Sequence, residues 1–326
     1  MRVLVTGVAG FIGSTTAELL LEQGHDVVGL DDLSTGRREN VPSAISFVEA
    51  SCGDEETLRS LGRFDACIHF AGRIEAGLSM DVPETFFAVN VADTVRLLNV
   101  LVELGTPRFV FSSSAAVYGN ATVSPITEDT PTDPQSPYGE SKLAVERLLH
   151  WLSRQQRLRV ASLRYFNAAG GTPRHPEHHQ PETHLIPLAL AAASGRGEPL
   201  KVFGTTYPTR DGTCVRDYIH VRDLALAHSL AMEALDDHEE IICNLGTGIG
   251  STIREVLDAI ERVTGNPVPT IEVDPRPGDP PSAVASNLRA RQLLGWEPAL
   301  TDLDQVIRDA AAAAPNTSKD ADFWYK

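Results

Sequence analysis

The chain has 326 residues, of which 42% are hydrophobic and 22% are charged, and its net charge at pH 7 is −16. A chain of this length can bury one large core or two moderate ones, and the composition is that of an ordinary soluble globular protein. The negative charge argues against nucleic acid or an anionic membrane surface as a partner, so an anionic ligand must be met locally by arginine, lysine or helix N-termini.

The first thirty residues predict a strand, a glycine-rich turn, a helix and a second strand. A buried strand at 2–6 leads into the turn at 7–13, a helix follows over 14–23, and a strand over 25–30 ends at Asp31. Glycines in such a turn let the backbone approach a pyrophosphate, which then faces the helix N-terminus. The aspartate stands 18 residues after the last glycine of the turn, as in a dinucleotide-binding unit. Its carboxylate can accept ribose hydroxyls and would repel a 2′-phosphate, so NAD is predicted over NADP.

The alternation of strands and helices continues to residue 165. Predicted strands lie at 46–50, 66–70, 108–112 and 159–165, and predicted helices lie at 55–61 and 83–105. Repeated βα units with apolar, β-branched strands predict an α/β fold with a Rossmann-like doubly wound parallel sheet, covered by helices on both faces. Ligands of such sheets bind beyond the carboxyl ends of the strands. The candidate residues at these ends are Gly7, Asp31, Ala71, Ser114 and Asn167.

A smaller mixed α/β substrate domain is predicted over 171–326, because proline, glycine and histidine become frequent there and the elements become shorter. The NAD-binding domain then covers 1–170. The segment from about 215 to 246 is expected to rejoin it, since a helix at 221–235 and a strand at 241–245 are regular. Later elements of the second domain are helices at 251–265 and 302–313 and a core anchor at Trp296.

Neither a targeting segment nor a membrane-spanning segment is predicted. Strand-like sequence follows Met1 directly and leaves no room for a signal peptide, and no apolar stretch is expected to be long enough to cross a bilayer. The four cysteines are scattered without metal-ligand spacing, which is typical of buried thiols in a reducing compartment. A cytoplasmic protein without a membrane partner is therefore expected.

A tyrosine and a lysine four residues apart open an amphipathic helical run. Tyr138 and Lys142 then lie one turn apart on the same helix face. A free tyrosine hydroxyl has a pKa near ~10, and an adjacent ammonium favours the phenolate and lowers that pKa. Lowering it to about 7 requires roughly 4 kcal/mol, of which one lysine supplies a part and a cationic nicotinamide ring could supply more. The spacing alone is a common accident, so its meaning depends on the surrounding motifs.

Seven short motifs are distributed over nearly the whole chain. They are the glycine turn at 6–13, His-Phe-Ala-Gly at 69–72, the serine-rich segment at 111–119, the segment at 134–142 that contains the tyrosine and the lysine, Leu-Arg-Tyr-Phe-Asn at 163–167, the block at 211–225 and Arg-Pro-Gly-Asp at 276–279. Together they resemble the extended short-chain dehydrogenase/reductase superfamily and, within it, the UDP-glucose (UDP-galactose) 4-epimerase family. The block at 211–225 is the most family-specific of them.

The resemblance implies a role for each residue of the site. Tyr138 would be the acid/base, Lys142 its electrostatic partner, and Ser114 a hydrogen-bond partner of the reacting sugar hydroxyl. The residues implied to bind NAD are Gly7, Gly10, Phe11, Ile12, Gly13, Asp31, Asp32, Phe70, Ala71, Gly72, Asn90, Ser112, Ser113, Tyr138, Lys142 and Tyr165. The residues implied to bind the UDP-sugar are Ser114, Asn167, His184, Leu185, Lys201, Phe203, Arg216, Arg276 and Ala283.

Within these sets, Asn90 and the serines at 112 and 113 would shape the nicotinamide pocket, and Phe203 would stack on uracil. Arg216 and Arg276 would hold the diphosphate, since guanidinium forks match phosphate oxygens. The alternative for these two arginines is a purely structural role, in an ion pair with Asp217 or Asp279.

The implied activity is NAD-dependent 4-epimerisation of a UDP-hexose. The phenolate would take the proton of the 4-hydroxyl while carbon 4 delivers hydride to NAD, and hydride return to the opposite ring face would invert carbon 4. Ala283 stands where some members carry tyrosine, which would leave room for an N-acetyl group, so UDP-GlcNAc is expected as a secondary substrate. A 4-epimerase of UDP-glucuronate stays open, since an arginine or histidine near the sugar could meet its carboxylate.

Two other functions are disfavoured. A nucleotide-sugar 4,6-dehydratase or decarboxylase needs further acid/base groups where this chain has Ala115 and Ala116, and alanines cannot move protons. A non-catalytic NAD-sensing protein would have no need of Tyr138, Lys142 and Ser114 together.

The sequence bears on two further partners. His175, His178, His179 and His184 lie in a proline-rich loop with a spacing that fits no helical ligand pair, so no metal is expected. The helices at 83–105 and 138–157 resemble the pair that forms a four-helix dimer interface in the family. A homodimer is therefore expected, because exposed apolar residues on these helices would be costly in a monomer.

Overall fold

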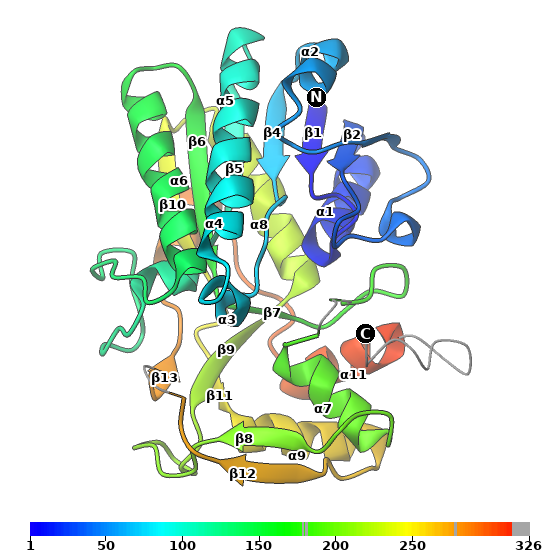
Figure 1. Cartoon of the computed structure of the whole chain (residues 1–326), viewed down its shortest axis with the longest axis vertical. Helices are drawn as coiled ribbons and strands as arrows, with labels where there is room; N and C mark the ends of the chain where they lie inside the picture. Colours follow the sequence, from blue (N-terminus) through cyan, green and yellow to red (C-terminus); the bar gives the residue numbers. More distant parts are fainter. Residues whose placement is uncertain (178, 180–181, 277–278, 315–326) are drawn as a thin grey trace.

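A parallel sheet of seven strands forms the centre of the larger part of the molecule (Figure 1). The computed structural model describes residues 1–314 apart from 178, 180–181 and 277–278. The strands are ordered β10-β6-β5-β4-β1-β2-β3, and every neighbouring pair is parallel. Their bounds are β1 Arg2–Thr6, β2 Asp26–Asp31, β3 Ser46–Glu49, β4 Ala66–His69, β5 Arg108–Ser114, β6 Arg159–Tyr165 and β10 Glu240–Leu245. The predicted Rossmann-like doubly wound sheet is confirmed, and its strand order reverses between β1 and β4.

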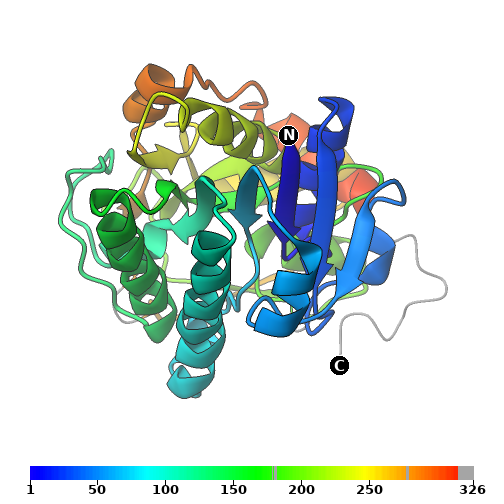
Figure 2. The same cartoon turned by 90° about the horizontal axis from the view of Figure 1, so that it is seen from above.

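Helices cover both faces of this sheet, as the view from above shows (Figure 2). One layer consists of α1 (Phe11–Glu22), α8 (Val221–Ala234) and α10 (Leu288–Leu294), and the other consists of α2 (Glu55–Leu61), α5 (Thr94–Glu103) and α6 (Pro137–Arg154). Neighbouring residues of one strand serve both layers, because side chains alternate along a strand. Val3 and Val5 pack in the first core and Leu4 packs in the second.

Two segments from the second half of the chain belong to the larger part. The strand predicted at 241–245 is β10, which pairs with β6 at the edge of the large sheet. The preceding helix, α8, packs against α1. Trp296, expected to anchor the second domain, is instead fully buried in the core of the first helical layer. Its Nε1 donates to the carbonyl oxygen of Asp223 at 2.9 Å, which joins the segment after α10 to α8.

The helix predicted at 83–105 is a run of three segments. It consists of α4 (Pro83–Phe86), a π-helical segment η2 (Phe87–Asp93) and α5. The run Pro83–Glu103 is long and apolar enough to cross a membrane by length and composition, with a mean hydropathy of 1.4 in its most apolar window. The prediction that no stretch reaches that length is therefore wrong. In this fold 39% of that window is buried inside the protein, where the run packs against α2 and α6.

The smaller part of the molecule lies against the carboxyl ends of the large sheet (Figure 1). Its strands are β7 (Asn167–Ala169), β9 (Val215–His220), β11 (Gly250–Thr252) and β13 (Ser282–Ala283) in one sheet and the parallel pair β8 (Leu200–Phe203) and β12 (Thr270–Val273). Its helices are α7 (Leu185–Ala193), α9 (Ile253–Thr264) and α11 (Leu303–Ala313), which share a separate core. Short helical segments elsewhere are η1 (Arg38–Asn40), α3 (Ala76–Ser79) and η3 (Ala115–Tyr118).

Candidate active site

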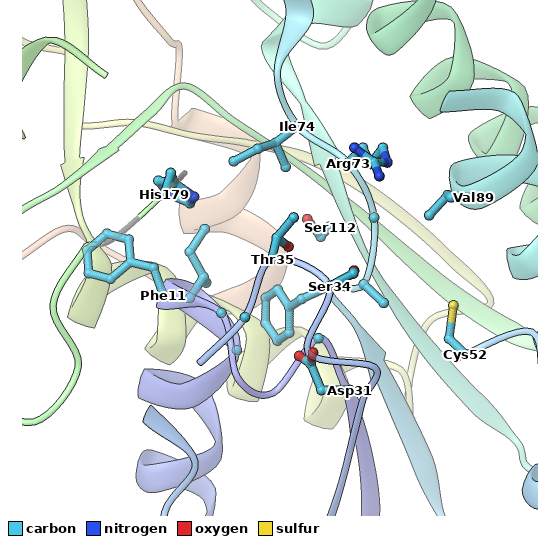
Figure 3. A pocket seen from close by; sticks show the side chains of 18 of the residues that line it. Phe11, Asp31, Ser34, Thr35, Cys52, Arg73, Ile74, Val89, Ser112 and His179 are labelled. Atoms are coloured by element: carbon cyan, nitrogen blue, oxygen red, sulfur yellow. The ribbon is translucent and has the colours of Figure 1, made fainter. Parts of the chain in front are cut away.

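A cavity of about 420 Å³ opens at the carboxyl ends of the central strands (Figure 3). The predicted cofactor and catalytic residues that line it are Gly7, Gly10, Phe11, Ile12, Gly13, Asp31, Asp32, Phe70, Ala71, Gly72, Ser112, Ser114, Tyr138 and Tyr165. They come from segments far apart in the chain and meet because the strands are parallel and end at the same edge of the sheet.

Two glycines of the turn at this cavity stand where a side chain would not fit. A Cβ at Gly7, where φ is +70°, would lie 2.6 Å from the backbone nitrogen of Ala71, and a Cβ at Gly13 would lie 2.1 Å from the Gly7 carbonyl oxygen. Helix α1 begins after Gly10, which caps it without a side-chain hydrogen bond. The first N–H groups of α1 therefore have no side-chain partner at the cap and are available to an anion.

Asp31 ends β2 at the wall of the cavity and is held by the backbone. One carboxylate oxygen accepts from the Ala9 N–H and the other from the Leu33 N–H, both at 2.9 Å. Burial raises the pKa of Asp31, and the two backbone donors oppose that rise. Each carboxylate oxygen has a further lone pair, so these contacts orient the group without using up its capacity as an acceptor.

Tyr138 lies in the first turn of α6, with its side chain at the cavity. The helix begins at Pro137, and the Ser136 side chain accepts from the Gly139 N–H at 3.2 Å, as a capping serine does. Burial raises the pKa of Tyr138, and its hydrogen bond with the Ser114 side chain opposes that rise. The sequence predicts that Lys142 lowers the pKa of Tyr138. In the protein chain alone the pKa is raised instead, because the effect of burial is larger than that of the favourable contacts.

Lys142 is buried beside the cavity and does not line it. Its Nζ donates to the Ser112 carbonyl oxygen at 2.9 Å and lies 5.0 Å from the centre of the Phe111 ring. Burial lowers the pKa of Lys142 to about 8, and the charge of Glu146 opposes that fall. Ser112 also hydrogen-bonds the Tyr165 hydroxyl across β5 and β6, which fixes the floor of the cavity.

Two residues predicted to shape the nicotinamide pocket lie behind its wall. Asn90 is 3% exposed and bonds both the N–H and the carbonyl of Arg73, at 2.8 and 3.0 Å. Ser113 points to the opposite face of β5 from its neighbours and donates to Glu146. Side chains alternate along a strand, so Ser113 cannot share a face with Ser112.

A second cavity, of about 580 Å³, lies next to the first in the smaller part of the molecule. Seven of the predicted substrate residues line it: Asn167, His184, Leu185, Lys201, Phe203, Arg216 and Arg276. The guanidinium carbon of Arg276 lies 3.9 Å from the centre of the Phe203 ring. Arg216 donates to the carboxylate of Asp279 at 2.6 Å and to the Pro280 carbonyl at 2.9 Å. The two cavities share lining residues, among them Asn167 and His184.

A cluster of charged side chains occupies this junction, and the sequence analysis included only its histidines. His184 Nδ1 lies 3.2 Å from Glu177 Oε1 and 2.9 Å from Glu182 Oε1. Burial alone would lower the pKa of His184, but the two carboxylates raise it overall. The sequence of the 175–184 loop alternates glutamates with histidines, and this pattern could have predicted an ion-pair cluster.

Ligand atoms of Glu177, His179 and His184 lie within 4.8 Å of one another, a grouping that could hold a metal ion. The absence of a metal therefore stays a prediction, and His178 lies outside the described residues. His184 Nδ1 faces two carboxylates and must carry a proton to donate to them, so this atom is already engaged in an ion pair.

Ala283 lies on β13 beside Arg216 and packs against the cluster that contains Tyr118 and Ile126, and it lines neither cavity. Asp217 was considered as an ion-pair partner for Arg216, but its carboxylate bonds backbone groups instead. It is fully buried and accepts from the N–H groups of Thr247, Gly248 and Ala285 at 2.8 to 3.1 Å. Asp217 thus ties β9 to the segments on either side of it.

Comparison with known proteins places these features in a family context. A model of the NAD dependent epimerase/dehydratase family matches residues 3–246. The chain is 44% identical to a UDP-glucose 4-epimerase of Corynebacterium glutamicum, over 96% of this chain and 95% of that protein.

Solved structures agree over the same length. A UDP-glucose 4-epimerase from Brucella ovis in complex with NAD is 44% identical, with a TM-score of 0.92 over 95% of this chain and 97% of that one. A UDP-glucose 4-epimerase from Bifidobacterium longum in complex with NAD⁺ and UDP is 34% identical, with a TM-score of 0.90 over 96% and 98% of the two chains.

Proposed function

This chain belongs to the NAD-dependent epimerase/dehydratase family and is an NAD-dependent 4-epimerase of a UDP-hexose, and we propose that Tyr138, Lys142 and Ser114 carry out its proton transfer. The observation that supports these roles is the hydrogen bond between Tyr138 and Ser114 at the wall of the first cavity. A buried ammonium group lies close by, with Lys142 Nζ 5.9 Å from the centre of the Tyr138 ring.

The residues of the first cavity fit NAD. The closely packed glycines of the turn and the uncapped N–H groups of α1 suit a pyrophosphate, and Asp31 suits the hydroxyls of a ribose. Asp32, Phe70 to Gly72, Ser112 and Tyr165 line the rest of the cavity, and Asn90, Ser113 and Lys142 support it from behind. When bound there, NAD would supply the acceptor and later the donor of the hydride at carbon 4 of the sugar.

The proton of the 4-hydroxyl is the part of the reaction that the chain itself handles. Tyr138 takes this proton as carbon 4 is oxidised to a ketone, and returns it when the ketone is reduced. Ser114 holds the reacting oxygen at the Tyr138 hydroxyl. Lys142 stabilises the phenolate by its charge, because its buried ammonium interacts through a medium of low dielectric constant.

The second cavity is proposed to hold the nucleotide while the sugar turns. Arg216 and Arg276 offer guanidinium groups to the diphosphate, which the net charge of −16 would otherwise repel. Phe203 offers a ring for uracil, and Lys201, Leu185, His184 and Asn167 complete the lining. A fixed UDP group allows the keto sugar to turn over and offer its opposite face to the first cavity, so the returned hydrogen can invert carbon 4.

Other reactions of the fold find less support. Ser114 is followed by Ala115 and Ala116 in η3, so this segment offers no additional acid or base for elimination of water or loss of carboxylate. A non-catalytic NAD-sensing protein would not need a tyrosine and a serine hydrogen-bonded at the wall of the cavity.

The sugar is proposed to be glucose or galactose, with the N-acetylated pair as secondary substrates. Ala283 supports this indirectly, since it is a small residue on β13 beside Arg216 of β9, and a tyrosine there would take up room next to the second cavity. Ala283→Tyr should reduce turnover of UDP-GlcNAc far more than turnover of UDP-glucose. Equal losses would remove the support for the N-acetylated substrate. UDP-glucuronate is the alternative, and it would be favoured by an ion pair between its carboxylate and His184.

We also propose a cytoplasmic homodimer whose chains bind NAD through 1–170 with the segment 215–246, and the nucleotide sugar through 171–326. Large apolar side chains stay exposed around α3, η2 and α6: Leu78 at 37%, Met80 at 62%, Phe87 at 39% and Trp151 at 57%. Such a surface is costly in water, and a second copy of the same helices would cover it. The mass in solution tests this, and a monomer at micromolar concentration would contradict it.

The activity is tested with the purified chain and three separate substrates: UDP-glucose, UDP-GlcNAc and UDP-glucuronate. Products are resolved by their configuration at carbon 4, and NAD released on denaturation is quantified. Conversion of UDP-glucose to UDP-galactose by protein that retains NAD is the expected result. A folded, NAD-loaded protein that converts only UDP-glucuronate would select the alternative substrate.

A further inference from the structure

A buried histidine links the end of the first strand to the long helical run after β4. His69 is the last residue of β4 and is 1% exposed. Its Nδ1 lies 2.6 Å from the hydroxyl of Thr6, the last residue of β1, and its Nε2 lies 2.9 Å from the hydroxyl of Thr94, at the start of α5. Both threonines are fully buried, so these contacts are not shared with solvent.

The hydrogen bonds around His69 are satisfied by one arrangement of protons. The Thr94 hydroxyl donates to the Asn90 carbonyl oxygen at 2.7 Å, so it can only accept from His69. His69 Nε2 therefore carries the proton, and Nδ1 accepts from the Thr6 hydroxyl. The Ala71 N–H in turn points at the Thr6 hydroxyl oxygen at 3.4 Å. Burial lowers the pKa of His69 to about 3, so the ring is neutral throughout the working pH range.

The same series of contacts continues into the catalytic helix through Asn90. Its Oδ1 accepts from the Arg73 N–H, which fixes the orientation of the amide, and its Nδ2 donates to the Ser141 hydroxyl at 3.0 Å. Ser141 donates to the Tyr138 carbonyl oxygen at 2.7 Å. Asn90 also limits Gly72, where a Cβ would lie 2.9 Å from the amide oxygen. Gly72 and Arg73 line the first cavity.

We propose that His69 is a positioning residue of the epimerase, which sets the place of Tyr138 and of the Gly72–Arg73 segment through Thr94, Asn90 and Ser141. This role rests on the proposed function of Tyr138. The chain of contacts runs from β1 and β4, which pair in the large sheet with Thr6 beside His69, to η2, α5 and α6. Apolar contacts tolerate small slides, whereas a directed series of hydrogen bonds does not.

Three substitutions at His69 separate its two ends. His69→Phe keeps a ring and removes both bonds. His69→Gln places an amide near Nε2 and can still donate to Thr94, whereas His69→Asn reaches only the Nδ1 side, toward Thr6. Thr94→Val breaks the same link from the other partner with little change in shape. Thr106→Val is the matched control, because within the described part of the chain the buried Thr106 hydroxyl has no hydrogen-bond partner, and it does not line the cavity.

Five quantities are measured: kcat and KM for UDP-glucose per NAD-loaded protein, NAD retained after gel filtration, the melting temperature, and the ¹⁵N shifts of the wild-type histidines. We expect His69→Phe and Thr94→Val to lower kcat about 10- to 100-fold, as misplacement of a reacting group does. KM should stay within about two-fold, because binding of UDP is not touched. His69→Gln should recover much of the loss and His69→Asn should not. Histidine spectra should show His69 protonated at Nε2.

Several outcomes would overturn the proposal. Full kcat in folded His69→Phe and Thr94→Val, or protonation of His69 at Nδ1 in the wild type, would each contradict it. Equal losses of kcat in Thr94→Val and Thr106→Val would reduce His69 to a general stability role. The wild-type protein is the control for the proposed function, since its failure to convert UDP-glucose would remove the reaction and leave the NMR result intact.

Discussion

Lys142 lies one helical turn after Tyr138, yet its Nζ donates to the Ser112 carbonyl oxygen at 2.9 Å and stays 5.9 Å from the centre of the tyrosine ring. The lysine is therefore anchored to β5, and its proposed action on Tyr138 is by charge. At such a separation in a buried site, the attraction between ammonium and phenolate is still substantial. Burial raises the pKa of Tyr138 in the protein chain alone. To lower that pKa, the attraction of Lys142 has to act together with other positive charge at the cavity.

The first prediction concerns the pH dependence of Lys142→Met. A base works only when it is deprotonated, so kcat should rise as the pH rises through the apparent pKa of Tyr138. Removing the cation should shift that apparent pKa upward by about one unit or more. The measurement is kcat against pH from neutral to alkaline solution. Arg147→Met, an exposed site on the same helix, is the control, and coinciding profiles for both variants would argue against the role of Lys142.

The second prediction is that Tyr138→Phe lowers kcat about 10²- to 10⁴-fold, because it removes the general base. The retained NAD should change little, since the phenyl ring still fills the wall of the cavity. The comparison is with Tyr207→Phe, which deletes a buried hydroxyl that has no hydrogen-bond partner among the described residues. A Tyr138→Phe protein that turns over at the rate of Tyr207→Phe would exclude Tyr138 as the base.

The third prediction assigns Arg276 to binding. Arg276→Met removes the charge over the Phe203 ring and should raise KM for UDP-glucose about 10- to 100-fold, the loss expected for a charge-assisted contact to phosphate. NAD retention should be unchanged, because Arg276 lines only the second cavity. Arg254→Met breaks an exposed ion pair with Glu272 and serves as the control. An unchanged KM in Arg276→Met would show that Arg276 does not bind the diphosphate.

The fourth prediction concerns the buried ion pair behind β5. Arg164 and Glu146 have side chains that are 6% and 4% exposed, and Glu146 also accepts from Ser113. Glu146→Gln leaves the Arg164 charge uncompensated and should cost about 3–5 kcal/mol of unfolding free energy. The double variant Glu146→Leu with Arg164→Met should recover part of that cost, because the stranded charge is gone. Urea unfolding measures both, and additive losses in the double variant would contradict the pairing.

The fifth prediction is acid sensitivity through His228. Its Nδ1 donates to the Leu224 carbonyl at 2.8 Å, and burial lowers its pKa from 6.5 to about 4. The unfolded chain therefore binds the proton first, so the stabilisation is complete above the unfolded pKa and is lost as the pH falls toward the folded one. Between neutral pH and about pH 5, protonation linked to His228 should lower the free energy of unfolding by about 2 kcal/mol. The unfolding free energy of His228→Phe should fall less over that interval, and parallel curves would contradict the assignment.

The sequence predicted the parts of the site that depend on neighbours in the chain. The glycine turn, Asp31 at the end of β2, and the tyrosine and lysine one helical turn apart are set by local spacing, and the structure has them on those elements. Ser113 could also have been placed from the sequence. Side chains alternate along a strand, so in β5 Ser113 must point to the opposite face from Ser112.

Other features had no local signal. Nothing near Trp296 in the sequence indicates that it packs in the core of the large sheet, and nothing near His69 names Thr6 and Thr94 as its partners.

The sequence by itself thus determined the fold class, the glycine-rich turn and the identities of the proposed catalytic side chains, because each is encoded within one strand, turn or helix. The tertiary structure decided which of these side chains face the cavity, where Lys142 directs its charge, and which acids surround His184. These depend on contacts between segments far apart in the chain, and their geometry is fixed only when the sheet, its two helical layers and the smaller part pack together.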